Sequence, residues 1–74
     1  MSLKKTNIHG APVYFEDNAK AGAEHLAYDL QYEEAVVFFR HARAYGSAQF
    51  EDDQERQFTL VYNSDGTYLI KRRV

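Results

Sequence analysis

Apolar and polar positions alternate most regularly over the last twenty residues, 55–74. Two runs rich in β-branched and aromatic residues, 57–63 and 67–72, stand on either side of the turn sequence Ser64-Asp65-Gly66. Runs of this composition around a short turn that contains glycine are typical of a β-hairpin. The pattern therefore predicts two antiparallel strands in this part of the chain.

The length of the turn decides which residues of the hairpin share a face. A two-residue Asp65-Gly66 turn mixes charge into the apolar face, whereas a three-residue loop places Tyr62 opposite Tyr68. We predict the three-residue loop, with its glycine in the left-handed conformation. The apolar face then consists of Phe58, Leu60, Tyr62, Tyr68 and Ile70. The mixed face includes Val61 and Leu69, which indicates that a partner covers it in part.

The first half of the chain predicts one short strand and one helix. Val13-Tyr14-Phe15 follows Pro12 and has strand composition. Asp17 or Asn18 then provides a helix N-cap. Small and aliphatic residues recur at helical spacing after this cap, at Ala19, Ala23, Leu26, Ala27 and Leu30. Gly22 inside the helix costs about 1 kcal/mol relative to alanine, and the small residues of the stripe let the helix lie close to a sheet.

Residues 31–45 carry signals for both helix and strand. Val36-Val37-Phe38-Phe39 has strand composition, yet acidic residues stand near the start of the segment and basic residues near its end. This charge distribution favours a helix, and Gly46 is a natural residue to follow its last turn. We predict a helix that ends either as early as Phe39, with an extended chain after it, or just before the glycine.

A further strand is predicted over Ser47 to Glu51, with Asp52-Asp53-Gln54 as the turn into the hairpin. The order of elements is then β-α-α-β-β-β. This order indicates an α+β fold in which two helices pack on one face of a small, mostly antiparallel sheet. We expect a single domain over residues 1–74, with the polar residues 1–10 loose.

Composition excludes several classes of protein. The chain has no cysteine, so neither a disulfide nor a cysteine-based metal site can stabilise it. Its formal net charge of −2 provides no overall positive field for nucleic acid. It has no apolar stretch near ~18 residues and no signal-peptide pattern. We therefore expect a soluble, cytoplasmic protein without membrane contact, and we expect no cofactor.

The aromatic content points to an interface. The chain has 5 phenylalanines and 6 tyrosines, whereas a domain of this size buries only about 60% of its unfolded surface. Surplus aromatic side chains on a surface usually mark a binding site for another protein. We therefore expect a homodimer that forms through exposed aromatic side chains and an exposed sheet edge, or else binding to another protein partner.

The basic cluster Arg40, His41 and Arg43 is the best candidate for chemistry. Cleavage of RNA without a metal needs a base for the 2′-hydroxyl, cations for the charged phosphate and an acid for the leaving oxygen. Histidine and arginine can fill these roles near neutral pH. The structural alternative is that the cations stabilise the C-terminal end of the predicted helix.

Three other charged features have a structural explanation beside a functional one. His25, on the first predicted helix, is expected at the surface or its boundary, and the three histidines show no metal-ligand spacing, so we expect no metal site. The segment 51–55 holds four acids, but it lacks the glycine and the spacing of a calcium loop and is expected to be a solvated turn. Lys71-Arg72-Arg73 either contacts phosphate or guards a sheet edge.

Several short motifs in the middle of the chain form a pattern known from one family. They are Phe15-Glu16-Asp17, Lys20-Ala21, Leu30-x-Tyr32-Glu33-Glu34-Ala35 with Phe39, and Glu55-Arg56 followed by Phe58-Thr59-Leu60 and Gly66. This pattern resembles the BrnT-type ribonuclease toxins of type II toxin–antitoxin systems. The resemblance implies a RelE-like fold, with Lys20 and Arg56 at positions similar to the family's active site. Tyr28-Asp29 stands where the family has His-Gly, and Glu24 where it has Asn, so the family's helix histidine has no counterpart.

Two functions follow from these observations. The first is a small, non-enzymatic α+β protein that acts by self-association or by binding a protein partner. The alternative is a BrnT-like, metal-independent ribonuclease, active or degenerate. That enzyme would act on RNA with Lys20, Arg56, His41 and Arg43 as its catalytic residues.

Overall fold

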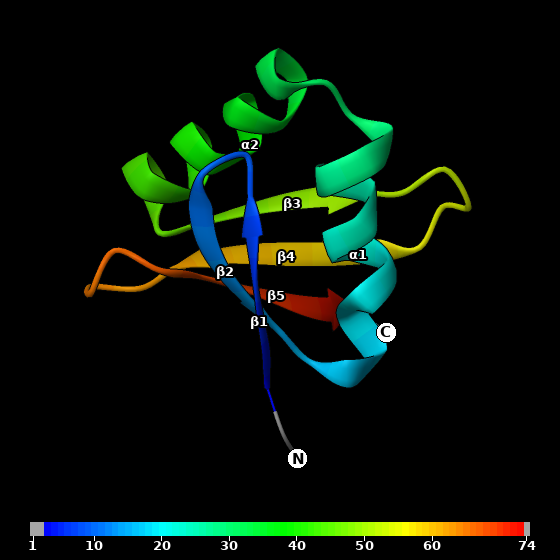
Figure 1. Ribbon diagram of the computed structural model, residues 1–74, viewed down its shortest axis with the longest axis horizontal. Helices are drawn as coiled ribbons and strands as arrows, with labels where there is room; N and C mark the ends of the chain where they lie inside the picture. The colour runs from blue at the N-terminus through cyan, green and yellow to red at the C-terminus, as the bar shows by residue number, and fades with distance from the viewer. Residues whose placement is uncertain (1–2, 74) are drawn as a thin grey trace.

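The computed structural model describes residues 3–73 and shows a five-stranded sheet with helices packed on one face (Figure 1). The strands are β1 (Lys4–Ile8), β2 (Ala11–Phe15), β3 (Ser47–Glu51), β4 (Gln57–Tyr62) and β5 (Tyr68–Arg73). The helical segments are a 3-10 turn (Asp17–Ala19), α1 (Lys20–Glu24), a π-helical turn (His25–Asp29) and α2 (Tyr32–Tyr45). The predicted α+β class is confirmed.

The sheet has the strand order β1-β2-β5-β4-β3. Neighbouring strands are antiparallel except β2 and β5, which run parallel. In Figure 1 the sheet twists strongly, so that β1 and β2 run at a steep angle to β3 and β4. The predicted order of elements is confirmed from β2 onward, and β1 precedes it as an additional strand.

Alternation along the strands builds the core. One residue in two points to the helices and is buried, whereas its neighbours point to the opposite, outer face of the sheet. The sheet contributes Val13, Phe15, Phe50, Phe58, Leu60 and Ile70 to the core. The helices contribute Ala19, Ala23, Leu26, Ala35, Phe39 and Ala42. Large side chains from the sheet therefore meet mostly small ones from the helices.

The C-terminal hairpin has the register predicted from its turn. Tyr62 pairs with Tyr68 and Leu60 with Ile70. The loop has three residues, and the N–H of Asn63 donates to the Thr67 carbonyl at 2.8 Å to close it. Its glycine has a φ of 90°, in the left-handed region that the three-residue loop requires.

The start of the chain differs from the expectation of a loose segment over residues 1–10. Residues 4–8 form strand β1 and pair with β2, while residues 1–2 lie outside the described part of the chain. Two local features explain the strand. Ile8 is 1% exposed and anchors it in the core, and His9-Gly10 forms a two-residue turn in which both residues have positive φ, at 51° and 88°. Such a turn is suited to a tight hairpin.

The two helical regions keep their predicted places with altered details. Helical structure begins at Asp17, with Glu16 rather than Asp17 or Asn18 as the residue before the first turn. The helical signal of α2 prevails over the strand composition of its middle, and the helix continues to Tyr45. A capping box supports its start, because the Gln31 N–H donates to the Glu34 carboxylate at 2.9 Å.

β5 lies inside the sheet, between β2 and β4. The parallel pairing with β2 joins segments from opposite ends of the sequence, but it covers only Tyr68 to Ile70. Lys71-Arg72-Arg73 extends beyond it and pairs with β4 alone, so the expectation that these residues guard a sheet edge stays a prediction. The outer strands are β1 and β3, and β1 carries the lysines Lys4 and Lys5, which discourage pairing with another chain.

The first helix packs closely against the sheet at Gly22. A Cβ atom added there would lie 2.8 Å from Cγ and Cδ1 of Phe58 and 3.1 Å from Cδ2. Phe58 is fully buried, at 0% exposure, so its ring cannot move into solvent. The small residues of the helix stripe allow this close packing, as the sequence indicated.

We expect Gly22→Ala to destabilise the fold although alanine is the better helix former. The helix gains about 1 kcal/mol from the substitution, but overpacking against a buried ring costs about 1–3 kcal/mol. The urea midpoint of the variant should fall. In a Phe58→Leu background the same substitution should cost less, because the ring is gone. A rise in stability for Gly22→Ala alone would contradict the contact.

Candidate functional site

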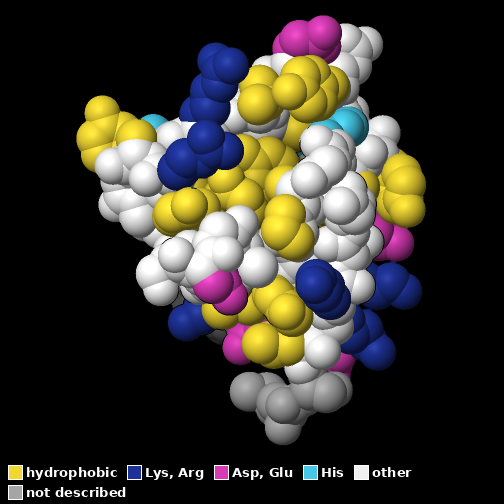
Figure 2. All heavy atoms as spheres, turned by 60° about the vertical axis from the view of Figure 1, so that its left-hand side comes forward, with side chains coloured by type: hydrophobic (Ala, Val, Ile, Leu, Met, Phe, Trp, Pro, Cys, Tyr) yellow, Lys and Arg dark blue, Asp and Glu magenta, His cyan; other side chains and the backbone are white. Residues whose placement is uncertain are grey.

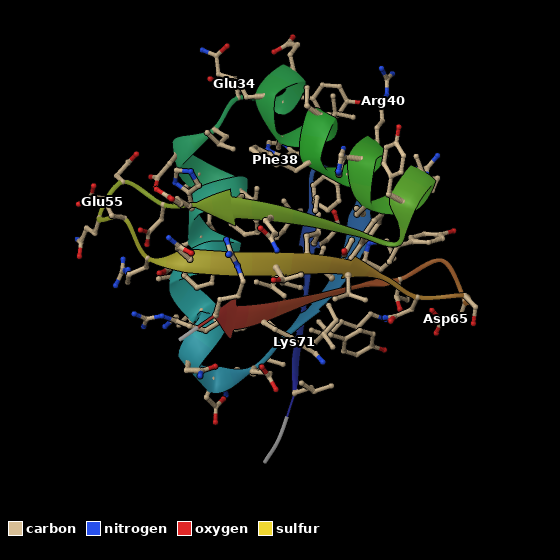
Figure 3. All side chains as sticks on the ribbon, turned by 180° about the vertical axis from the view of Figure 1, so that it is seen from behind. Glu34, Phe38, Arg40, Glu55, Asp65 and Lys71 are labelled. Atoms are coloured by element: carbon tan, nitrogen blue, oxygen red, sulfur yellow. The ribbon has the colours of Figure 1, made fainter. Side chains whose placement is uncertain are left out.

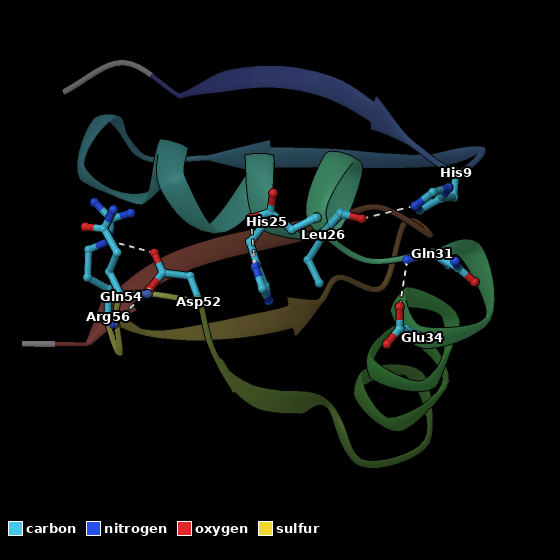
Figure 4. A network of polar contacts seen from close by, with 9 residues as sticks. His9, His25, Leu26, Gln31, Glu34, Asp52, Gln54 and Arg56 are labelled. Carbon is cyan, nitrogen blue, oxygen red and sulfur yellow. Dashed lines mark hydrogen bonds and ion pairs between the residues drawn. The ribbon is translucent and has the colours of Figure 1, made fainter.

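Arg56 is held in a partly buried ion pair at the turn between β3 and β4. Its Nε donates to Oδ2 of Asp52 at 2.6 Å, and its backbone N–H donates to Oδ1 of the same carboxylate at 2.9 Å. The backbone N–H of Gln54 gives a further hydrogen bond to Oδ1 at 3.0 Å (Figure 4). The carboxylate is 3% exposed. Asp52 therefore organises the turn, and Arg56 neutralises its charge.

These contacts set the protonation of Asp52. Burial alone raises the pKa of its carboxyl, but the hydrogen bonds from Arg56 and Gln54 and the positive charge of Arg56 outweigh burial. The pKa of Asp52 therefore lies below its usual value. The acidic segment 51–55 is thus only partly the solvated turn that the sequence suggested, because one of its acids is a buried structural residue.

The side chain of Arg56 lines a cavity of about 330 Å³ beside this turn. Glu24, Asp29, Asp52 and Asp53 also line this cavity. Four carboxylates around one arginine make the cavity unfavourable for an RNA phosphate. Lys20 does not line it, and instead lines a separate cavity of about 150 Å³ between α1 and β1.

His41 and Arg43 lie on the second half of α2. Both are exposed, and the ring of His41 lies against that of Tyr45 at a centroid distance of 4.7 Å. Arg43 donates from Nη2 to the hydroxyl of Tyr68 at 3.5 Å. Arg43 lines a groove between α2 and the β1–β2 turn, which neither Lys20 nor Arg56 lines. None of these three cavities is lined by more than one of the four residues named from the sequence.

His25 is buried, contrary to the expectation of a surface or boundary position. It is 7% exposed, and its ring stacks on Phe50 at a centroid distance of 6.4 Å and an angle of 8°. Its Nδ1 hydrogen-bonds Oδ2 of Asp29 at 3.0 Å. A spacing of four residues on a helix places the two side chains on one face, and this spacing is the sequence signal for their contact.

One ligand atom from each of His25, Asp29 and Asp53 lies within 4.8 Å of the other two. Imidazole and carboxylate groups are common ligands of divalent metals. The Nδ1 of His25 and Oδ2 of Asp29 already hydrogen-bond each other, and Asp29 and Asp53 are exposed to solvent. Exposed acidic groups commonly lie this close without a metal, so the cluster by itself carries no metal assignment.

The outer face of the sheet carries a row of apolar side chains that none of the described helices covers. The register places Tyr14, Leu69 and Val61 side by side on the neighbouring strands β2, β5 and β4. All three are half-buried, and Figure 3 looks onto the outer face of β3, β4 and β5 with the helices behind. Lys5 closes one end of the row, with Nζ 5.5 Å from the centre of the Tyr14 ring.

The exposed tyrosines are spread over the helical segments and do not form a row of this kind. Tyr28 is 82% exposed, Tyr32 55% and Tyr45 77%, and they lie at different positions along the helical segments. The sequence predicted that some aromatic side chains lie at the surface but did not indicate which ones. The outer face is therefore the more continuous candidate surface.

Comparison with known proteins does not identify a family. No protein-family model matches the chain, and searches of curated proteins and of solved structures find no match. The resemblance to BrnT-type toxins therefore stays a prediction. Among the described residues, no helix is long and apolar enough to cross a membrane.

We expect Asp52→Asn to lower the free energy of unfolding by about 2 kcal/mol at pH 7, because it breaks a charge-assisted network around a buried group. The folded-state pKa of Asp52 is depressed. The wild type's advantage should therefore be present above the unfolded pKa, ~3.9, and disappear as pH falls through the folded pKa. Urea unfolding of both proteins across this pH range measures the difference.

Asp53→Asn is the matched control, because Asp53 is exposed and adjacent. It should change stability by less than about 0.5 kcal/mol. A difference between wild type and Asp52→Asn that stays constant from neutral to acidic pH would show that the charge of Asp52 does not support the turn.

Proposed function

We propose that this protein acts by self-association through the outer face of its sheet, as a non-enzymatic homodimer that can also present this face to a protein partner. The observation that carries the proposal is the row Tyr14, Leu69 and Val61, which is continuous across three strands and which no other element of residues 3–73 covers. Antiparallel sheets commonly bury one face and leave the other to water with polar residues. An apolar row on the second face departs from that pattern and supports an interface.

The size of the chain also supports self-association. A standard interface buries about 800 Å² per partner, which is about one sixth of the 4786 Å² of accessible surface here. A domain of this length has a thin core. Packing two sheets face to face would therefore add a substantial apolar layer, at a spacing of about 10 Å.

The charges around the row are compatible with a two-fold arrangement. Lys71 extends from β5 on the outer face, and Glu51 extends from the same face at the far edge, on β3. An isologous interface brings one patch against a copy of itself. A patch that holds both signs of charge can form opposite-charge contacts at its rim in such an arrangement.

The ribonuclease alternative has less support from the geometry. None of the three cavities described above brings two of its four residues together, and the cavity beside Arg56 is lined by four carboxylates. Arg56 has a structural role that accounts for its position, since it neutralises the buried Asp52. The binding function is therefore the better account of the fold.

The proposal predicts that Val61→Lys shifts the protein from dimer to monomer at high micromolar concentration, because it places a charge in the middle of the buried row. Sedimentation equilibrium gives the mass of each species. Val37→Lys is the matched control, since Val37 is 60% exposed on α2, away from the outer face, and should leave the dimer intact. A wild type that is monomeric at this concentration, or equal dissociation by both variants, would overturn the proposal.

We also expect RNA to remain intact when it is incubated with the wild type in the presence of a chelator. Arg56→Ala is a poor test of the alternative, because it leaves Asp52 buried without its partner and destabilises the fold. Lys20→Ala changes an exposed residue and avoids this problem. Cleavage of RNA by the wild type that is lost in Lys20→Ala would establish the ribonuclease function in place of the binding one.

A further inference from the structure

A groove of about 360 Å³ lies between α2 and the turn that joins β1 to β2, on the helix side of the sheet. Its volume falls within the range of about 300–1,000 Å³ that is typical of small-molecule sites. One face of α2 forms a long wall, because its contributing residues recur at helical spacing: Tyr32, Val36, Phe39 and Arg43. Figure 2 shows hydrophobic side chains gathered on this end of the molecule, with Lys or Arg side chains beside them.

The base of the groove is aromatic and firmly packed. Phe39 and Tyr68 are 5% and 3% exposed, and their rings meet nearly at right angles with a centroid distance of 4.8 Å. The ring of Tyr62 lies 5.2 Å from that of Tyr68. Phe39 and Tyr68 therefore present only small parts of their rings to the groove, and the half-buried Tyr62 presents more. The packing of the three rings against one another keeps this base rigid.

The opposite wall is the β1–β2 turn, which is held in place by His9. The Nε2 of His9 donates to the backbone carbonyl of Leu26 at 3.0 Å (Figure 4), and its ring meets that of Tyr32 edge to face at 5.8 Å. His9 has a positive φ, which is uncommon for a residue other than glycine. These contacts fix the wall relative to α2.

Arg43 places a positive charge at the side of this groove without a carboxylate partner. Within residues 3–73 the ion pairs are those of His25 with Asp29 and of Asp52 with Arg56. The only side-chain hydrogen bond of Arg43 in this part of the chain goes to the neutral hydroxyl of Tyr68. The planar guanidinium can present two parallel donors to a carboxylate. An anionic group in the groove would therefore complement the charge of Arg43.

We propose that the groove binds a small carboxylic acid with a flat apolar body. Its carboxylate would pair with Arg43, and its body would lie on Phe39, Tyr62 and Tyr68. The charge complementarity at Arg43 and the aromatic base together define this class of ligand, since neither a simple anion nor a neutral hydrocarbon uses both. The site goes beyond self-association, because the groove lies on the helix side of the sheet and the apolar row lies on the outer face.

Titrations followed by two-dimensional amide NMR test the site with three probes. The compound 3-phenylpropionate carries both features, 3-phenylpropanamide lacks the charge, and acetate lacks the ring. We expect 3-phenylpropionate to shift the amides of α2 and of the β1–β2 turn, and to bind about tenfold or more tightly than either of the other two. Equal binding of all three probes, or shifts scattered over the whole surface, would overturn the proposal.

Two arginine variants locate the charge. Arg43→Gln should remove the preference for the acid over the amide, whereas Arg40→Gln, one turn away and not part of the groove lining, should keep it. Loss of the preference in both variants would mean a general surface charge effect and would refute the assignment. Repeating the titration with Val61→Lys separates the two proposals, because the groove should bind its ligand whether or not that variant dimerises.

Discussion

The approach of the first helix to the sheet at Gly22 sets the dimensions of the core. The ring of Phe58 lies directly beneath this glycine, where a Cβ would come within 2.8 Å of it. The same ring stacks on Phe50 at 5.4 Å and lies under the guanidinium of Arg72 at 6.0 Å. Because protein interiors are close-packed, a larger residue at Gly22 would push the helix away from all of these groups. The small residues of the helix and the large residues of the sheet therefore have complementary volumes.

Local sequence signals predicted the elements whose contacts are local. The C-terminal hairpin follows from its turn chemistry, and the register of Tyr62 with Tyr68 follows from the alternation of its faces. The parallel pairing of β2 with β5 could not be predicted in this way, because it joins distant segments, and the turn sequence carries no information about it. β1 was missed for a related reason: its composition is polar, and its place depends on one buried residue, Ile8, and on the turn after it.

The candidate sites likewise combine residues that the sequence identifies with residues that only the tertiary structure brings together. Sequence reasoning selected Arg43 for its charge, and the structure places it beside a groove, but the aromatic residues that complete the groove come from α2, β4 and β5. It selected Arg56 by resemblance, although the role visible in the structure is to neutralise Asp52. His25 is buried rather than at the surface or its boundary, because its ring stacks on Phe50, which lies on a different element.

Strand β5 connects the two proposed surfaces through adjacent residues. Tyr68 faces the groove and Leu69 faces the outer side of the sheet, as alternation along a strand requires. β5 is hydrogen-bonded to β2 over Tyr68 to Ile70 on one side and to β4 on the other, so the backbone of both residues is held by neighbouring strands. Coupling between two sites needs a difference in binding free energy between two states of the molecule. The pairing of β5 on both sides opposes such a change at Tyr68 and Leu69, and we expect occupancy of the groove and of the outer face to be independent.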